Sequence, residues 1–169
     1  MVVRTVAILT FSLLLAFSAA PVHADSLVAP LRFLLGEWEA LSPPSGERGG
    51  FTFSITVQDR VIVRTNYAEY PARDGRPASR HDDLMIVYVE GDRLNALYVD
   101  SEEHVIRYAV QPHGDREVVF ISEPKPSEPR YRLTYTASAD RTLIGRFEIA
   151  APGTSDAFKP YLSWTARRR

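Results

Sequence analysis

From Phe51 to the C-terminus, apolar and polar residues alternate in short runs, with Gly, Pro, Asp or charged clusters between them at intervals of about ten residues. Alternation with period two indicates strands that bury one face, and such breaks indicate turns. The clearest run is FTFSITV at residues 51–57, where Phe51, Phe53, Ile55 and Val57 share one face. No comparable stretch has a long helical period.

Further runs of this kind follow at residues 60–70, 83–90, 93–100, 104–111, 116–123, 130–138, 142–150 and 161–166. With a strand near Trp38, the total is about ten. Short breaks, such as Gln58-Asp59 and Gly91-Asp92, make successive strands hairpin neighbours in a meander. An open sheet would leave two edges unpaired, and closure removes them. The sequence predicts an all-β fold, an antiparallel up-and-down barrel of about ten strands.

Two segments rich in proline and charge interrupt this rhythm, at residues 71–83 and 123–130. We expect both to be loops, and the first is long enough to form a lid across an opening. Before the strands, Leu31, Leu34 and Leu35 follow Pro30 at helical spacing, and Gly36 ends the pattern. This spacing predicts a short N-terminal helical turn that plugs one end of the barrel.

The first residues have the pattern of a secretory signal peptide. Arg4 precedes the apolar run at residues 6–17, and small residues lead to Ala24. That run is well short of the roughly 20 residues that a membrane-spanning helix needs, and no second one follows. The chain has no Cys, which excludes a lipoprotein start, and no Arg-Arg pair precedes the apolar run, which argues against twin-arginine export. We predict a Sec-type signal peptide at residues 1–24 and one barrel domain at residues 25–169.

Composition bears on the compartment and the partners. The chain has no Cys and no Asn-x-Ser/Thr site, which favours a bacterial periplasmic or secreted protein. Without residues 1–24, the 20 Lys and Arg become 19 against 21 Asp and Glu, a net charge near −2. This balance argues against a nucleic-acid partner. We also expect no integral membrane segment in the mature chain, and its oligomeric state stays open.

Gly36-Glu37-Trp38, directly after the apolar turn, resembles the Gly-x-Trp signature of lipocalins and their wider calycin-type superfamily. The stretches LRFLLGEWEA and DSEEHVIRY look like small exported bacterial proteins of lipocalin-like type. The resemblance implies that Gly36 and Trp38 close the barrel bottom and that Arg167 packs on the Trp. Lipocalins have eight strands and a Thr-Asp-Tyr-type motif. This chain has more strands and lacks that motif.

An early Gly-x-Trp in a ten-strand barrel also resembles nitrobindin-type haem barrels. Those proteins continue the motif with further glycines, where Glu39, Ala40 and Leu41 stand here. Their haem-binding His lies near the C-terminus, and this chain has no His after His113. We therefore expect no haem and no other cofactor.

Motifs with a known catalytic mechanism are absent: the chain has no Gly-x-Ser-x-Gly, no phosphate-binding Gly-Lys-Ser/Thr and no His-Glu-x-x-His. His104 is the most interesting single residue because it is in phase with Ile106 and Tyr108. An inward His104 would sit near the barrel mouth, where it could transfer protons. The alternative, which we favour, is a rim His beside Glu102-Glu103.

The tripeptide His81-Asp82-Asp83 has metal-ligand residue types, but three adjacent residues do not converge on one ion without a sharp fold. We expect a solvated loop end and no metal site. Strand phase turns Arg132 and Arg146 toward water, and leaves Arg64 unsettled because Val61, Ile62 and Val63 make both faces apolar.

The tyrosines in the strand runs could line a cavity or fill a core. A ten-strand barrel is wide enough to hold a ligand, since eight strands already lie at the limit of a packed interior. We therefore predict a barrel that binds a small apolar or amphipathic molecule, and we favour a binding protein over an enzyme. The proposed ligand-binding residues are Tyr67, Tyr88, Tyr98, His104 and Tyr108.

Two alternatives stay open. The first is an enzyme in which His104, with Tyr98 or Tyr108, carries out acid–base chemistry. The second is an envelope interaction protein whose barrel is a scaffold, which predicts a broad exposed apolar patch.

Overall fold

The computed structural model describes residues 27–44, 46–154 and 156–169. The predicted signal peptide lies outside the described residues. Within them, no helix has the length and apolar character needed to cross a bilayer.

The described chain forms one short helix and ten strands, in agreement with the predicted barrel. The helix η1, a 3-10 helix, is Ala29–Leu34. The strands are β1 Gly36–Ala40, β2 Arg48–Thr56, β3 Val61–Tyr70, β4 Ser79–Glu90, β5 Arg93–Asp100, β6 Val105–His113, β7 Glu117–Ser122, β8 Arg130–Ala137, β9 Thr142–Ala150 and β10 Lys159–Arg168.

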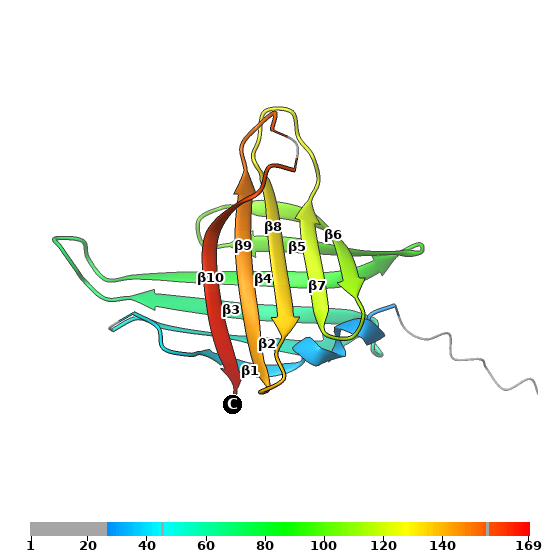
Figure 1. The fold of residues 1–169 in the computed structure, drawn as a ribbon, viewed down its shortest axis with the longest axis horizontal. Helices are drawn as coiled ribbons and strands as arrows, with labels where there is room; N and C mark the ends of the chain where they lie inside the picture. Colours follow the sequence, from blue (N-terminus) through cyan, green and yellow to red (C-terminus); the bar gives the residue numbers. More distant parts are fainter. Residues whose placement is uncertain (1–26, 45, 155) are drawn as a thin grey trace, which may run out of the picture.

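Each strand pairs antiparallel with its neighbour in sequence, and β1 pairs with β10 to close the ring. In Figure 1, β7–β10 stand upright in front of β2–β5, which run across the view. The barrel is therefore a clam shell of two crossing walls. In ring order, four strands separate β3 from β8 on either side, so β3 and β8 lie opposite each other.

The helix η1 lies at the end of the barrel where β1 begins, which we call the plug end. Leu31 and Leu34 are fully buried, and Trp38 donates from Nε1 to the Leu34 carbonyl oxygen at 2.7 Å. Arg32 also contacts Asp59 in the turn between β2 and β3. The predicted helical turn is thus confirmed, and it packs into the core beside Trp38.

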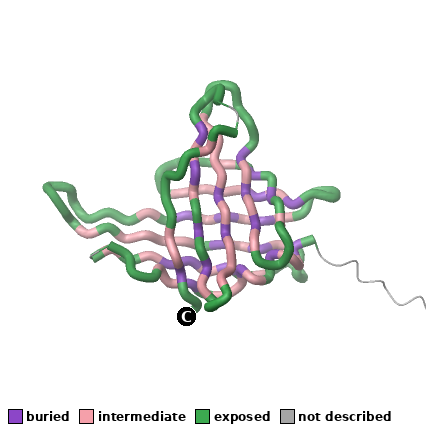
Figure 2. The backbone as a smooth tube through the Cα atoms, in the orientation of Figure 1, coloured by how far each residue is buried: buried purple, intermediate pink, exposed green. Residues whose placement is uncertain are grey.

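The core lies inside the barrel, where alternate residues of most strands are buried (Figure 2). Its centre is a cluster of rings in edge-to-face or tilted contact: Phe51, Phe53, Tyr135 and Phe120, with Tyr108 against Phe120. Such contacts add to the free energy of apolar burial. The predicted inward face of the first clear run therefore holds for Phe51 and Phe53.

The loop expected at residues 71–83 is shorter than predicted. Strand β3 continues to Tyr70, β4 starts at Ser79, and the two pair from Tyr70↔Ser79 inward. The prediction failed because polar residues at the start of β4 were interpreted as a loop. They instead continue the strand alternation, and Asp83 is buried rather than solvated.

Candidate functional site

A charged residue lies at the centre of the barrel. Arg64 on β3 is in phase with the buried Ile62 and is only 4% exposed. Its guanidinium reaches across the lumen, where Nη1 donates to the Tyr135 hydroxyl oxygen on β8. Because β3 and β8 are opposite strands, this hydrogen bond spans the barrel.

Asp83 on β4 is the counterion of Arg64. Arg64 Nη2 donates to Asp83 Oδ1, and Asn66 Nδ2 donates to Asp83 Oδ2 at 2.7 Å. Strand register produces this contact, since Asn66 pairs directly with Asp83. Burial acts to lower the pKa of Arg64, but Tyr135 and Asp83 outweigh it and raise the pKa. The guanidinium therefore stays charged inside the barrel.

The network continues toward the end of the barrel opposite η1, which we call the mouth. Asp83 pairs in register with Asp100, the last residue of β5. His81 Nε2 lies 3.4 Å from both Asp83 Oδ2 and the Tyr98 hydroxyl, and Tyr98 donates to Asp100 Oδ2 at 3.1 Å. A chain of polar contacts thus runs from Tyr135 at the centre to the mouth.

Asp100 also holds the loop between β5 and β6. Its Oδ1 accepts from the backbone N–H groups of Glu102 and His104, both at 2.9 Å. Burial acts to raise the pKa of Asp100, but these hydrogen bonds and those from the His104 and Tyr98 side chains lower it. The pKa of Tyr98 is raised, first by burial and then by Asp83 and Asp100. Asp100 is therefore an ionised acceptor and Tyr98 a neutral donor.

His104 is positioned by Asp100 at the rim of the mouth. Its Nδ1 lies 2.9 Å from Asp100 Oδ2, while its side chain is 55% exposed. A neutral imidazole with its proton on Nδ1 toward the carboxylate presents a basic Nε2. No described residue contacts that Nε2 by a hydrogen bond. His104 Nδ1 and the Tyr98 hydroxyl thus contact the same oxygen atom, Asp100 Oδ2.

The burial of inward-facing apolar side chains differs between the two ends of the barrel. Near the plug, Ile62, Val87, Val118 and Leu143 are completely buried. Toward the mouth, the inward residues are only partly buried although they pack against the core: Tyr98, Ile106, Tyr131, Phe147 and Trp164. Completely buried apolar side chains thus lie in the plug half, where Ile55 and Ala137 are partly buried, and the large aromatic side chains at the mouth keep surface accessible to solvent.

Aromatic contacts order this mouth surface. Tyr131 stacks on Phe147 with ring centroids 5.8 Å apart, and Phe147 meets the exposed Tyr161 edge-on at 6.1 Å. Trp164 lies directly against Gly145, where an added Cβ would be 2.1 Å from the indole ring. Only glycine therefore permits the indole to lie so close to the wall.

The structure separates the five residues predicted to bind ligand. Tyr98 and Tyr108 face the lumen, with Tyr108 buried at 3% exposure, and His104 stands at the rim. Tyr67 and Tyr88 occupy the opposite strand phase, on the outer face of the wall. Arg80 stacks over Tyr67 there. Tyr67 and Tyr88 thus do not line the lumen, because a shift of one residue along a strand exchanges its faces.

Gly36 and Trp38 lie at the plug end as the resemblance implied, but the arginine differs by one position. The Arg168 guanidinium lies 4.9 Å from the centre of the Trp38 ring and next to Gly36. Arg167 faces outward and lies 3.5 Å from Glu39. Arg168 and not Arg167 contacts Trp38 because Trp38 pairs directly with Arg168 in the register of β1 and β10.

Sequence reasoning missed most of the polar network. The strand pattern does not settle the direction of Arg64, predicts a solvated loop end for Asp83, and gives no sign of the parts that Asn66, Asp100 and Tyr135 play in the network. One signal was available, since Arg64, Asn66 and Asp83 fall in phase with buried apolar residues of their own strands. The strand-phase prediction for Arg132 and Arg146 agrees with the structure, although Arg132 is half-buried against Glu148.

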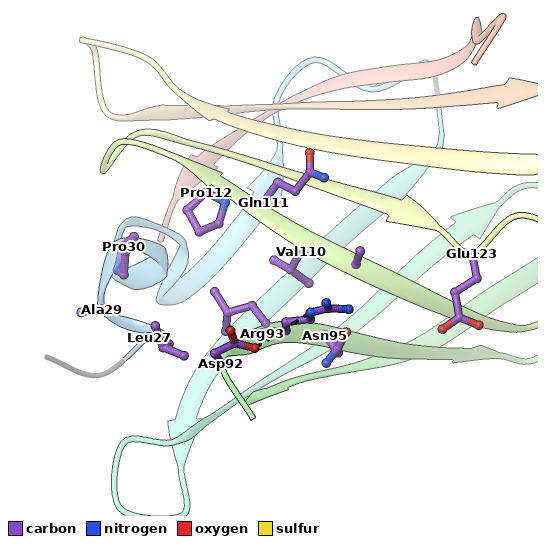
Figure 3. A pocket seen from close by; sticks show the side chains of 12 residues that line it. Leu27, Ala29, Pro30, Asp92, Arg93, Asn95, Val110, Gln111, Pro112 and Glu123 are labelled. Atoms are coloured by element: carbon purple, nitrogen blue, oxygen red, sulfur yellow. Dashed lines mark ion pairs between the residues drawn. The ribbon is translucent and has the colours of Figure 1, made fainter. Parts of the chain in front are cut away.

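Two depressions lie outside the lumen. The larger, of about 890 Å³, is a groove bordered by η1, the turn before β5, and β6 (Figure 3). Its lining mixes small apolar residues such as Pro30 and Val110 with Arg93 and Glu123, and it adjoins Leu27, the first described residue. The smaller lies over Thr52, Tyr67 and Arg80 on the outer wall. Of the residues in the Arg64–Asp100 network, Asn66 alone borders one of these depressions, the smaller. We place the candidate site at the mouth, where the network meets partly accessible aromatic side chains.

The described residues contain no group of three or more His, Cys, Asp and Glu side chains arranged to hold a metal ion. His81 and Asp83 instead serve the hydrogen-bond network, and Asp82 pairs with Arg80 on the outer wall.

Comparison of the chain with protein-family models and with curated protein sequences finds no match.

Proposed function

We propose that this protein is a barrel that binds a small, mostly apolar molecule at its mouth. The observation that carries the proposal is the group of large aromatic side chains that face the lumen at the mouth and remain partly accessible, whereas the aromatic rings at the centre of the barrel are buried. Partly apolar sites with a few fixed polar groups are typical of small-molecule binding. The signal peptide predicted at residues 1–24 supports a periplasmic or secreted location.

Neighbouring residues on opposite faces of β6 provide a matched test. Ile106 faces the lumen and is partly buried, whereas Val105 faces outward and is 60% exposed. Ile106→Gln should weaken binding of the neutral fluorescent probe phenylnaphthylamine by roughly tenfold, because it places an amide in the apolar lining. Val105→Gln should leave the affinity unchanged.

The measurement is a fluorescence titration of the protein purified from the periplasm of an expression host. Native mass spectrometry of the same sample would show any ligand that copurifies. A barrel that does not bind the probe, or that loses affinity equally in both variants, would contradict the proposal.

A second candidate function is acid–base catalysis, favoured by the single oxygen of Asp100 that contacts both His104 Nδ1 and the Tyr98 hydroxyl. A carboxylate that orients a His is a recurring feature of general-base catalysis. The test is a screen of small esters and carbonyl compounds. Turnover should be lost in His104→Gln and kept in Glu103→Gln. Turnover that survives in His104→Gln would remove this candidate.

The scaffold alternative predicts a broad apolar patch. Among the described residues, the large exposed apolar side chains come from many parts of the chain, such as Val57 in a turn near the plug, Val105 on β6 and Tyr161 on β10. This distribution favours the binding barrel over the scaffold.

A further inference from the structure

Two N–H groups near the centre of the barrel lack a protein acceptor. Arg64 Nε is buried and has no hydrogen-bond partner. Trp164 Nε1 likewise donates to no described residue. Both side chains flank Tyr135, since Arg64 bonds to its hydroxyl and the Trp164 ring meets it edge-on at 5.9 Å. Buried N–H groups are nearly always paired in folded proteins, so Arg64 Nε needs an acceptor. Trp164 is only partly buried, and its N–H group is a second donor that no described residue uses.

We propose that the ligand is a neutral, mostly apolar molecule with a hydrogen-bond-accepting oxygen, for which the Arg64 and Trp164 N–H groups are the donors. The inference rests on the binding function proposed above and adds the chemical class of the ligand. Ketones, esters and alcohols with an apolar body belong to this class.

The charges around the site argue against an anionic head group. The positive charge of Arg64 is already compensated by Asp83, which faces Asp100 across the β4–β5 pair. An anionic ligand at Arg64 would meet these two carboxylates, and like charges at short range disfavour binding.

The same network argues against a cationic head group. Asp83 already accepts hydrogen bonds from Arg64 and Asn66, and Asp100 accepts them from Tyr98 and from the loop that His104 ends. Each carboxylate oxygen of Asp83 and of Asp100 therefore already has a hydrogen-bond donor. A neutral acceptor uses the free N–H groups and disturbs neither carboxylate.

Gly145 supports a specific position for the indole donor. Any larger residue there would displace the Trp164 ring, because its Cβ would lie 2.7 Å from Nε1 itself. Gly145 on β9 thus lets the Trp164 ring lie close to the wall, with its N–H group at a defined place.

The test compares three naphthalene probes with the intact protein. Prodan is a neutral ketone whose emission shifts to longer wavelength when its carbonyl accepts a hydrogen bond; phenylnaphthylamine is neutral and has no oxygen; anilinonaphthalenesulfonate is an anion. We expect Prodan to bind more tightly than the other two and to show the shifted emission of a hydrogen-bonded carbonyl.

Trp164→Phe keeps the aromatic ring but removes its N–H group. It should weaken Prodan binding by roughly 3- to 10-fold and reverse part of its emission shift, while phenylnaphthylamine binding is unchanged. The matched control is Trp38→Phe at the plug end, which should leave the ratio of the two affinities unchanged. Arg64→Lys keeps a cation beside Asp83 but removes Nε, and it should act like Trp164→Phe. If it does not fold, Trp164→Phe decides.

The outcomes separate the two proposals. If neither neutral probe binds, the binding function itself fails. If phenylnaphthylamine binds but Prodan gains no affinity and no emission shift, or if Trp164→Phe leaves the affinity ratio unchanged, the acceptor oxygen is ruled out. Tighter binding of the anion would overturn the neutral class.

Discussion

Tyr135 on β8 accepts a hydrogen bond from Arg64, which projects from β3 on the opposite side of the ring of strands. This contact joins the two walls of the clam shell at mid-height. The plug half lies on one side of it, and the mouth with its partly accessible aromatic side chains lies on the other. It is therefore both a structural tie and the base of the candidate site.

Removal of the Tyr135 hydroxyl should destabilise the barrel. Tyr135→Phe leaves the ring in the aromatic cluster but deprives a buried guanidinium of an acceptor, which costs about 1–3 kcal/mol in free energy of unfolding. Urea unfolding monitored by circular dichroism measures the change. Tyr88→Phe on the outer wall is the control, and an equal loss in both variants would refute a special role for the Arg64 contact.

The buried ion pair should show strong coupling. Asp83→Asn leaves the charge of Arg64 uncompensated and should cost about 3–5 kcal/mol. Arg64→Met combined with Asp83→Leu removes both charges and should recover much of that loss, since apolar replacements of whole buried pairs are often tolerated. A double-mutant cycle of Arg64→Met, Asp83→Leu and the variant with both substitutions, followed by urea unfolding, measures the coupling. Additive effects of the two substitutions would argue against it.

Protonation of Glu148 in acid should lower the free energy of unfolding of the barrel. Hydrogen bonds from Arg132 hold the pKa of Glu148 below its usual range, despite its burial. A carboxylate with a lowered folded-state pKa stabilises the protein above its unfolded pKa of about 4.3, and this contribution is lost as the pH falls through the folded value.

The free energy of unfolding should therefore decrease between about pH 5 and pH 3, and Glu148→Gln should flatten this decrease. Urea unfolding at several pH values measures it, with Glu90→Gln in an exposed position as the control. If the free energy of unfolding decreases as steeply with pH in Glu148→Gln as in the unaltered protein, the role given to Glu148 is wrong.

The two C-terminal arginines should differ in their effect on stability. Arg168→Ala removes the cation that stacks on Trp38 and should cost about 0.5–1 kcal/mol. Arg167→Ala breaks only an exposed contact with Glu39 and should change stability by less than about 0.5 kcal/mol. Thermal unfolding and the emission of the buried Trp38 compare the two. The reverse order would support Arg167 as the packing residue.

The sequence by itself determined the architecture: an antiparallel ten-strand barrel, the positions of its tight turns, the helical plug and the inward faces of residues such as Phe51 and Phe53. These follow from local signals, because period-two alternation and turn residues act within a few positions of one another.

Only the tertiary structure decided the candidate site. Around Arg64 both strand faces are apolar, so its direction depended on pairing with β2 and β4. Asp83 became a buried counterion, and Arg168 rather than Arg167 met Trp38, through register that local pattern does not specify. Arg64 and Tyr135 are 71 residues apart and meet only because the ring closes. Contacts across a lumen depend on closure and register, and a slip of one residue would exchange every face.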